Sequence, residues 1–264
     1  MSRSNNTELI TPCQRFFDWN GDKGLLKYYD KTAVNPTNPE KTGLNIEIKL
    51  PFTFIVLDIL STITGFSDTD NSGFWSNEIR DIKKEIFIVR NKKGKVFEGN
   101  YDALKAANIS GIKYAQSVYI AFKNENEMII GNIKMVGSSL GSWIDFRKKH
   151  DVYKGAISIK STLEGKKGKT VYQMPVFTPI QISDDSNQIA IDLDKELQEY
   201  LTAYFNKSKI DKNEESVIET MVNESVKEAF GLPEDLFIDD EPKSMKETIM
   251  NRNIIDDSSL NLPF

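Results

Sequence analysis

One short stretch of the chain contains the residue types of a serine hydrolase. Gly137-Ser-Ser-Leu-Gly141 fits the G-x-S-x-G pattern around a nucleophilic serine, and Asp145 and His150 follow in the order Ser, Asp, His. That pattern requires a strand before the serine and a helix after it. Here all three groups fall within twelve residues that we interpret as β-structure, and His150 is the only histidine. We therefore predict no catalytic residues and no enzyme activity.

Two further patterns of ligand-binding chemistry are incomplete. Gly165-Lys-Lys-Gly-Lys-Thr170 is similar to a phosphate-binding loop, but two residues separate its glycines where such a loop has four. We interpret it as a basic hairpin turn. A single cysteine, Cys13, excludes a disulfide framework, and with one histidine a zinc site of Cys and His ligands is not available. We expect neither a metal nor another cofactor.

The stretch from Arg80 to Lys169 has the composition of a nucleic-acid binder, with 19 Lys+Arg against 9 Asp+Glu. Proteins that bind single strands combine cations for the phosphates with flat rings on which bases stack. A lysine at a turn can also be merely solvated, and an aromatic ring can equally belong to the core. Trp75 and Trp143 are the main stacking candidates. The full set of candidate DNA-binding residues is Trp75, Trp143, Tyr28, Tyr29, Tyr114, Tyr119, Phe146, Lys92, Lys93, Lys95, Arg147, Lys148, Lys149, Lys166, Lys167 and Lys169.

Charge is divided unevenly along the chain. Residues 1–183 hold 26 Lys+Arg and 19 Asp+Glu, a net charge of +7, whereas residues 184–264 hold 8 and 20, a net charge of −12. The overall charge of −5 therefore conceals a basic body and an acidic tail. Such asymmetry is typical of a nucleic-acid binder whose tail mimics the charge of DNA.

The last eleven residues, 254–264, have the composition of a captured peptide. Asp256 and Asp257 precede the apolar tip Leu262-Pro-Phe264, in which the proline stiffens the backbone before the final aromatic ring. The segment has too few apolar residues to fold alone. We expect a partner protein to bind Asp256, Asp257, Leu262, Pro263 and Phe264, with the ring in a pocket and the carboxylates on basic residues.

This tip resembles the C-terminus of bacterial single-stranded DNA-binding proteins and their phage counterparts, which end in a run of Asp and a short Pro-Phe terminus. Here Ser-Ser-Leu-Asn separates the two aspartates from Leu262-Pro-Phe264. The resemblance implies a body with an OB-fold, a tail that competes with DNA for the binding groove, and a tip that recruits replication and recombination proteins.

Short strands dominate the pattern of the first 180 residues. We predict about eight strands, including a hairpin with Tyr114–Phe122 and Glu127–Val136, one or two strands over 44–64, and a strand at Trp143–Phe146. A single short helix, 101–107, is expected after the capping residue Asn100. Residues 34–42 and 66–77 are interpreted as loops. Two helices are expected later, the first ending near Phe205 and the second near Phe230.

The predicted fold class is mainly β (α+β), an elaborated OB-fold-like antiparallel barrel with one or two C-terminal helices and a disordered acidic tail. We expect an OB-like DNA-binding body over 1–183, a helical extension over 184–232, and the disordered tail with its partner-binding tip over 233–264. The helices are expected either to pack on the body or to form a homo-oligomer.

The functional hypothesis is sequence-independent binding of single-stranded DNA in replication, recombination and repair, by a phage-type protein in the cytoplasm, or in the host cytoplasm if a phage encodes it. No apolar run reaches the roughly 18 to 20 residues of a membrane span, so no membrane partner is expected. The alternatives are a β-rich viral structural or assembly protein with an acidic tail and a strand-annealing recombination mediator.

Overall fold

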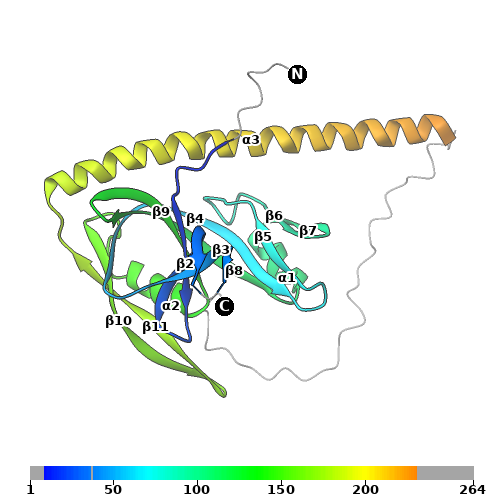
Figure 1. Ribbon diagram of the computed structural model, residues 1–264. Helices are drawn as coiled ribbons and strands as arrows, with labels where there is room; N and C mark the ends of the chain where they lie inside the picture. Colours follow the sequence, from blue (N-terminus) through cyan, green and yellow to red (C-terminus); the bar gives the residue numbers. More distant parts are fainter. Residues whose placement is uncertain (1–8, 37, 231–264) are drawn as a thin grey trace. The chain divides into compact units, whose positions relative to one another are not determined.

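The computed structural model describes residues 9–36 and 38–230 and contains one large sheet and three helices (Figure 1). Its strands are β1 (Arg15–Asn20), β2 (Leu25–Asn35), β3 (Asn38–Ile48), β4 (Phe52–Ser67), β5 (Ser72–Ser76), β6 (Phe87–Asn91), β7 (Gly94–Gly99), β8 (Ile112–Asn124), β9 (Glu127–Val136), β10 (Ala156–Lys167) and β11 (Thr170–Ile180). The helices are α1 (Tyr101–Ala107), α2 (Ser138–Arg147) and α3 (Asp184–Phe230). The predicted mainly β, α+β class is therefore confirmed.

The sheet is open and mixed. Its strand order is β3-β2-β1-β9-β8-β4-β5-β6-β7, and β10 pairs with both β4 and β11. Every pairing between the strands above is antiparallel except that of β1 with β9, where Phe17 lies opposite Ile133. The predicted all-antiparallel arrangement is wrong at this point. No tight turn joins β1 to β9, so the connection does not impose an antiparallel direction.

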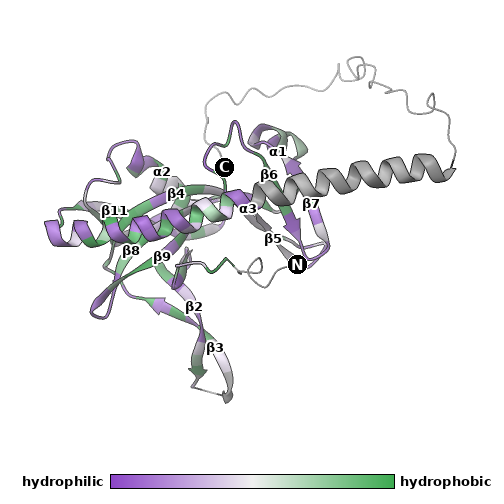
Figure 2. Cartoon of the chain, turned by 90° about the horizontal axis from the view of Figure 1, so that it is seen from above, coloured by the Kyte–Doolittle hydropathy of each residue, from purple (hydrophilic) through white to green (hydrophobic). Residues whose placement is uncertain are grey.

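Strand β4 is the central element of the sheet. One of its edges pairs with β8 from Phe54 to Gly65. Its other edge pairs with β10 at the beginning of the strand and with β5 at the end. Most of its side chains are buried, as expected for the continuous apolar run in its sequence, and Figure 2 shows β4 largely in hydrophobic colours. Residues 44–64 form parts of two strands, since β3 ends at Ile48 and β4 begins at Phe52.

The larger apolar core, which we call the main cluster, lies between the first part of β4, strands β1, β8 to β11 and helix α2. Its most deeply buried members include Phe17, Phe54 and Trp143. Trp143 lies in α2, so the predicted strand at Trp143–Phe146 is wrong. Leu140, Trp143 and Phe146 are buried at helical spacing on α2, a periodicity that four residues are too few to display.

A smaller core, the α1 cluster, lies between helix α1 and strands β4 to β6. It contains Ile63, Phe74, Ile79, Phe87, Val89, Tyr101 and Leu104. The helix has the predicted bounds and the predicted cap, because the side-chain oxygen of Asn100 accepts a hydrogen bond from the backbone N–H of Ala103 at 2.9 Å. Asn108, in a left-handed conformation at φ 41°, ends it.

Strands occupy most of both predicted loops, and turns remain at residue 36 and at residues 68–71. Residues 34–42 lie at the tip of the β2–β3 hairpin, where Asn35 is opposite Asn38. Residues 66–77 contain β5, which pairs with the end of β4. In each case pairing with a neighbouring strand overrides the local preference of Gly, Pro and Asn for turns. The predicted hairpin of β8 and β9 is confirmed.

Helix α3 is continuous where we predicted two helices. The residues between the two predicted helices, 206–216, contain neither Pro nor Gly, so nothing in them breaks a helix. The helix begins in a compact unit that ends at Leu201 and continues into a second unit that begins at Thr202. In the described part of the chain, no helix is both long enough and apolar enough to cross a membrane. The tip residues Asp256, Asp257, Leu262, Pro263 and Phe264 lie outside the described residues.

The first turns of α3 are attached to the sheet through a buried carboxylate, Asp58 of β4. Leu197 and Leu201 are fully buried. Beside them, Gln198 donates its side-chain N–H to Asp58 at 3.0 Å. The guanidinium of Arg80 contacts both oxygens of Asp58, at 3.1 and 2.8 Å. A bidentate arginine neutralises the buried charge, and the contact with Gln198 holds this part of α3 against the sheet.

A second carboxyl group near α3, that of Glu78, makes stability depend on pH. The hydroxyl of Tyr119 donates to Glu78 at 2.6 Å, and burial raises the pKa of Glu78 above its ordinary value. A raised carboxyl pKa stabilises the fold below the unfolded-state pKa, about 4.3, and this contribution is lost as pH rises through the folded-state pKa.

In the wild type we expect the free energy of unfolding to decrease as pH rises from about 4.3 toward neutrality. Glu78→Gln keeps an acceptor for Tyr119 but cannot ionise, so we expect this decrease to be smaller in the variant. Urea unfolding at a series of pH values measures this effect. Glu164→Gln, at an exposed position of β10, is the control. Identical pH profiles for wild type and Glu78→Gln would contradict the prediction.

Candidate nucleic-acid interface

The G-x-S-x-G motif lies between a strand and a helix, contrary to our interpretation of the whole stretch as β-structure. Gly137, at φ 59°, connects β9 to α2. Ser139 lies one residue inside the helix and is fully buried. Its hydroxyl accepts from the N–H of Val136 at 3.1 Å and donates to the carbonyl of Val136 at 2.9 Å. The serine therefore joins the start of α2 to the end of β9.

The two residues that would complete a triad make other contacts. Asp145 forms an ion pair with Lys148 at 3.3 Å, one helical turn away. The ring of His150 stacks on Phe146, with ring centroids 4.6 Å apart. Asp145 and His150 therefore both contact residues of α2 or its C-terminal end. No group of three or more His, Cys, Asp and Glu side chains within residues 9–36 and 38–230 is arranged to hold a metal ion.

Three of the predicted stacking residues are core residues. Trp143, Tyr119 and Phe146 have exposed fractions of 0%, 4% and 8%. A ring buried to this extent has no face available to a base, so their assignment to DNA binding is wrong. Helical spacing turns Trp143 and Phe146 toward the core, and Tyr119 lies in a part of β8 that is buried on both faces.

The other predicted aromatic residues reach the surface to different extents. Tyr28 is half-buried, and the Arg15 guanidinium lies 5.0 Å from its ring centroid. Tyr29 is exposed and its ring lies over Gly43 of the neighbouring strand, where a Cβ would overlap it. Trp75 is 49% exposed, although its neighbour Phe74 is buried. Phe74 therefore belongs to the core and Trp75 offers a ring to the solvent.

Trp75 lies in a row of directly paired residues that crosses five strands. Thr64 of β4 is opposite Lys113 of β8 on one side and Trp75 of β5 on the other. Trp75 is opposite Arg90 of β6, and Arg90 is opposite Lys95 of β7. Directly paired residues share a face of the sheet. We call Lys113, Thr64, Trp75, Arg90 and Lys95 the cross-strand row.

The cross-strand row lies on the face opposite α1. The neighbours in sequence of its members, Ile63, Phe74 and Val89, belong to the α1 cluster, and side chains alternate between faces along a strand. Adjacent strands are about 4.8 Å apart, so four spacings give the row a length of about 19 Å. One exposed aromatic ring is thus placed among three cations on the outer face of the sheet, one of which, Lys95, forms an ion pair with Glu98 at 2.9 Å.

The remaining basic candidates are dispersed. The ammonium of Lys93 pairs with Asp70 and lowers the pKa of that carboxyl, while Lys92 donates to the carbonyl of Asn71 at 3.2 Å. These contacts join the β6–β7 turn to the β4–β5 turn. In α2, Arg147 donates to the side-chain oxygen of Gln116 at 3.1 Å. Several of the lysines and arginines that we predicted to bind DNA therefore contact neighbouring residues of the chain.

Lys166, Lys167 and Lys169 lie at the tip of the β10–β11 hairpin, as the sequence predicted. Lys167 is opposite Thr170, and Gly168 adopts φ +61° at the turn. All three lysines are exposed. Lys167 also lines a cavity of about 560 Å³ together with Tyr114 and with Lys113 of the cross-strand row.

Two cations of the row, Arg90 and Lys113, were not predicted as binding residues. Lys113 lies apart from the basic clusters in sequence, and Arg90, two residues before Lys92, lies within a predicted strand and was not counted with the turn. The strand register alone brings them beside Trp75. Comparisons of the chain with protein-family models, with curated protein sequences and with solved structures found no match.

Proposed function

We propose that this chain binds single-stranded DNA without sequence preference along the cross-strand row. The observation that carries the proposal is the position of the exposed Trp75 ring between Arg90 and Thr64, with Lys113 and Lys95 at the ends of the row. Cations bind the phosphates of a strand, and a flat ring stacks with any unpaired base.

The chemistry of the row favours unpaired strands of any sequence. Stacking requires a base whose face is free, which a duplex does not offer. Every base has a π-face, so a single tryptophan discriminates little between them. The ammonium groups of Lys95 and Lys113 bind backbone phosphate, which carries no sequence information.

The proposal extends to features that only the sequence suggests. The body of such a protein would be related to the OB-fold, although its open mixed sheet has more strands than a five-stranded barrel. The acidic tail would compete with DNA, and the tip with Asp256, Asp257 and Leu262-Pro-Phe264 would recruit replication, recombination or repair proteins in the cytoplasm. The net charges of +7 and −12 for residues 1–183 and 184–264 support this division.

The proposal is tested by titrating the full chain with poly(dT) and following tryptophan fluorescence at several salt concentrations. We expect quenching and a linear decrease of the logarithm of affinity with the logarithm of salt. Three phosphate contacts, by Arg90, Lys95 and Lys113, correspond to a slope of about −2 for a single strand. An equally long duplex is expected to bind more weakly.

Neutralising the three cations together, as Arg90→Gln, Lys95→Gln and Lys113→Gln, is expected to reduce the magnitude of that slope by about 2. The matched control neutralises three exposed lysines that lie outside the row, Lys83, Lys123 and Lys154. Equal slopes for the two triple variants would exclude the row as the binding surface. Absence of binding by the wild-type chain would exclude the function and favour a structural role.

A further inference from the structure

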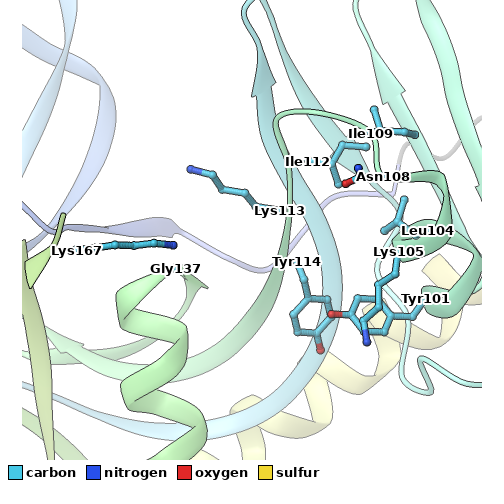
Figure 3. Close-up of a pocket in the computed structure, with 10 residues that line it drawn as sticks. All are labelled: Tyr101, Leu104, Lys105, Asn108, Ile109, Ile112, Lys113, Tyr114, Gly137 and Lys167. Carbon is cyan, nitrogen blue, oxygen red and sulfur yellow. The ribbon is translucent and has the colours of Figure 1, made fainter. Parts of the chain in front are cut away.

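The cavity beside Lys113 lies where the edge of one strand is left uncovered. Strand β8 begins at Ile112, but its partner β9 ends at Val136, opposite Ala115. Among residues 9–36 and 38–230, no strand therefore lies beside residues 112–114 on that side. The cavity of about 560 Å³ lies along this edge, with α1 and Ile109 on one side and Lys167 on the other (Figure 3).

The residues around the cavity are suited to an anion. Lys105, Lys113 and Lys167 line it, and none of the described lining residues carries a carboxylate. All three lysines are exposed, and none forms an ion pair within the described part of the chain. Figure 3 shows Lys113 and Lys167 extending toward each other across the gap from β8 and from the β10–β11 hairpin. Two ammonium groups that converge in this way can bind one phosphate group.

The other part of the lining is apolar and aromatic. Leu104, Ile109 and Ile112 line the cavity together with Tyr101 and Tyr114, whose ring centroids are 5.1 Å apart. The Tyr114 hydroxyl is 2.8 Å from that of Ser61, which holds its ring in place. A ligand for this cavity therefore needs a flat or apolar part in addition to its negative charge.

We propose that the cavity binds one nucleotide unit, with its phosphate between Lys113 and Lys167 and its base against Tyr114 and the adjoining apolar wall. The volume lies within the roughly 300 to 1,000 Å³ of small-molecule sites. This proposal rests on the proposed function in one respect: Lys113 is also the end of the cross-strand row, so a strand bound along the row would end at a residue that lines the cavity. The nucleotide is then either a unit of that strand or a free mononucleotide.

The experiment measures binding of thymidine 5′-monophosphate, thymidine and inorganic phosphate to the full chain by isothermal titration calorimetry, and binding of poly(dT) by fluorescence. The test variant is Lys167→Glu. Its matched control is Lys166→Glu, an identical charge reversal at the neighbouring residue of the same hairpin, which does not line the cavity. Loss of a charged hydrogen bond corresponds to about a tenfold or greater weakening.

We expect thymidine 5′-monophosphate to bind more tightly than thymidine or inorganic phosphate, and Lys167→Glu to weaken it about tenfold more than Lys166→Glu. If the affinity for poly(dT) also falls more in Lys167→Glu than in Lys166→Glu, the bound nucleotide is a unit of the DNA strand. If only the affinity for the mononucleotide shows this difference, the ligand is a free mononucleotide. Equal effects of the two variants on both ligands would overturn the proposal.

The experiment distinguishes an error in the cavity proposal from an error in the proposed strand-binding function. If poly(dT) quenches the fluorescence of all forms equally and no mononucleotide binds, the cavity proposal is wrong and the row is unaffected. If the mononucleotide binds with the expected dependence on Lys167 and poly(dT) does not bind, the cavity proposal holds and the proposed function is wrong.

Discussion

Replacing Trp75 with alanine is expected to remove most of the fluorescence quenching by poly(dT) and to weaken binding about 5- to 150-fold. A base stacked on an aromatic side chain contributes about 1 to 3 kcal/mol, which corresponds to this range. Trp75 is the tryptophan that a base can reach. Trp143 is fully buried, and Trp19 is half-buried with its indole N–H bonded to the carbonyl of Gln173 at 2.9 Å.

Two control variants separate stacking from general effects at the surface. Trp75→Phe keeps a flat ring at the same place and is expected to retain most of the affinity while losing the fluorescence signal, so its binding is followed by gel shift. Tyr153→Ala removes another exposed ring, 56% exposed, outside the cross-strand row. Equal loss of affinity in Tyr153→Ala and Trp75→Ala would contradict a specific role for Trp75.

The tryptophan of α2 is expected to behave in the opposite way. Trp143→Ala should lower the free energy of unfolding by about 3 to 5 kcal/mol, because it leaves a cavity in the main cluster. The ring lies 5.2 Å from that of Phe177 and 6.0 Å from that of Phe146, measured between centroids. Removing it takes away one ring contact between α2 and β11, while that of Phe146 with Phe177 remains. Urea unfolding followed by far-ultraviolet circular dichroism measures the loss.

The surface variant Trp75→Ala is the matched control for this experiment, since a substitution at an exposed site usually changes stability by less than about 0.5 kcal/mol. Trp143→Phe is expected to cost much less than Trp143→Ala. The buried indole N–H of Trp143 has no acceptor among the described residues, so phenylalanine removes an unpaired polar group along with some volume. A loss below about 1 kcal/mol for Trp143→Ala would show that the site collapses readily.

Local patterns predicted the local parts of the fold. The Asn100 cap and the alternating hydrophobicity of residues 114–122 and 127–136 each involve neighbours in sequence, and α1 and the β8–β9 hairpin were predicted correctly. Helix α2 was missed because Trp143 and Phe146 were interpreted over four residues, too short a window to separate the period of a helix from that of a strand.

The binding surface depends on contacts that the sequence does not display. A lysine cluster in the sequence shows only which residues are neighbours along the chain. In the structure, Lys92 and Lys93 connect the β6–β7 turn to the β4–β5 turn. The cross-strand row instead takes one residue from each of five strands. Its members are set by strand order and register, which depend on the packing of both faces of the sheet. Trp75 and Lys95 were therefore predicted, but their relation to Arg90 and Lys113 was not.

Strand β4 contributes side chains to both apolar clusters, with Phe54 in the main cluster and Ile63 in the α1 cluster. The pairings of β4 support both clusters, those near Phe54 with β8 and β10 and those near Ile63 with β8 and β5. We expect a ligand bound at Trp75 to slow amide hydrogen exchange in β10 as well as in β5, because both pair with the same strand.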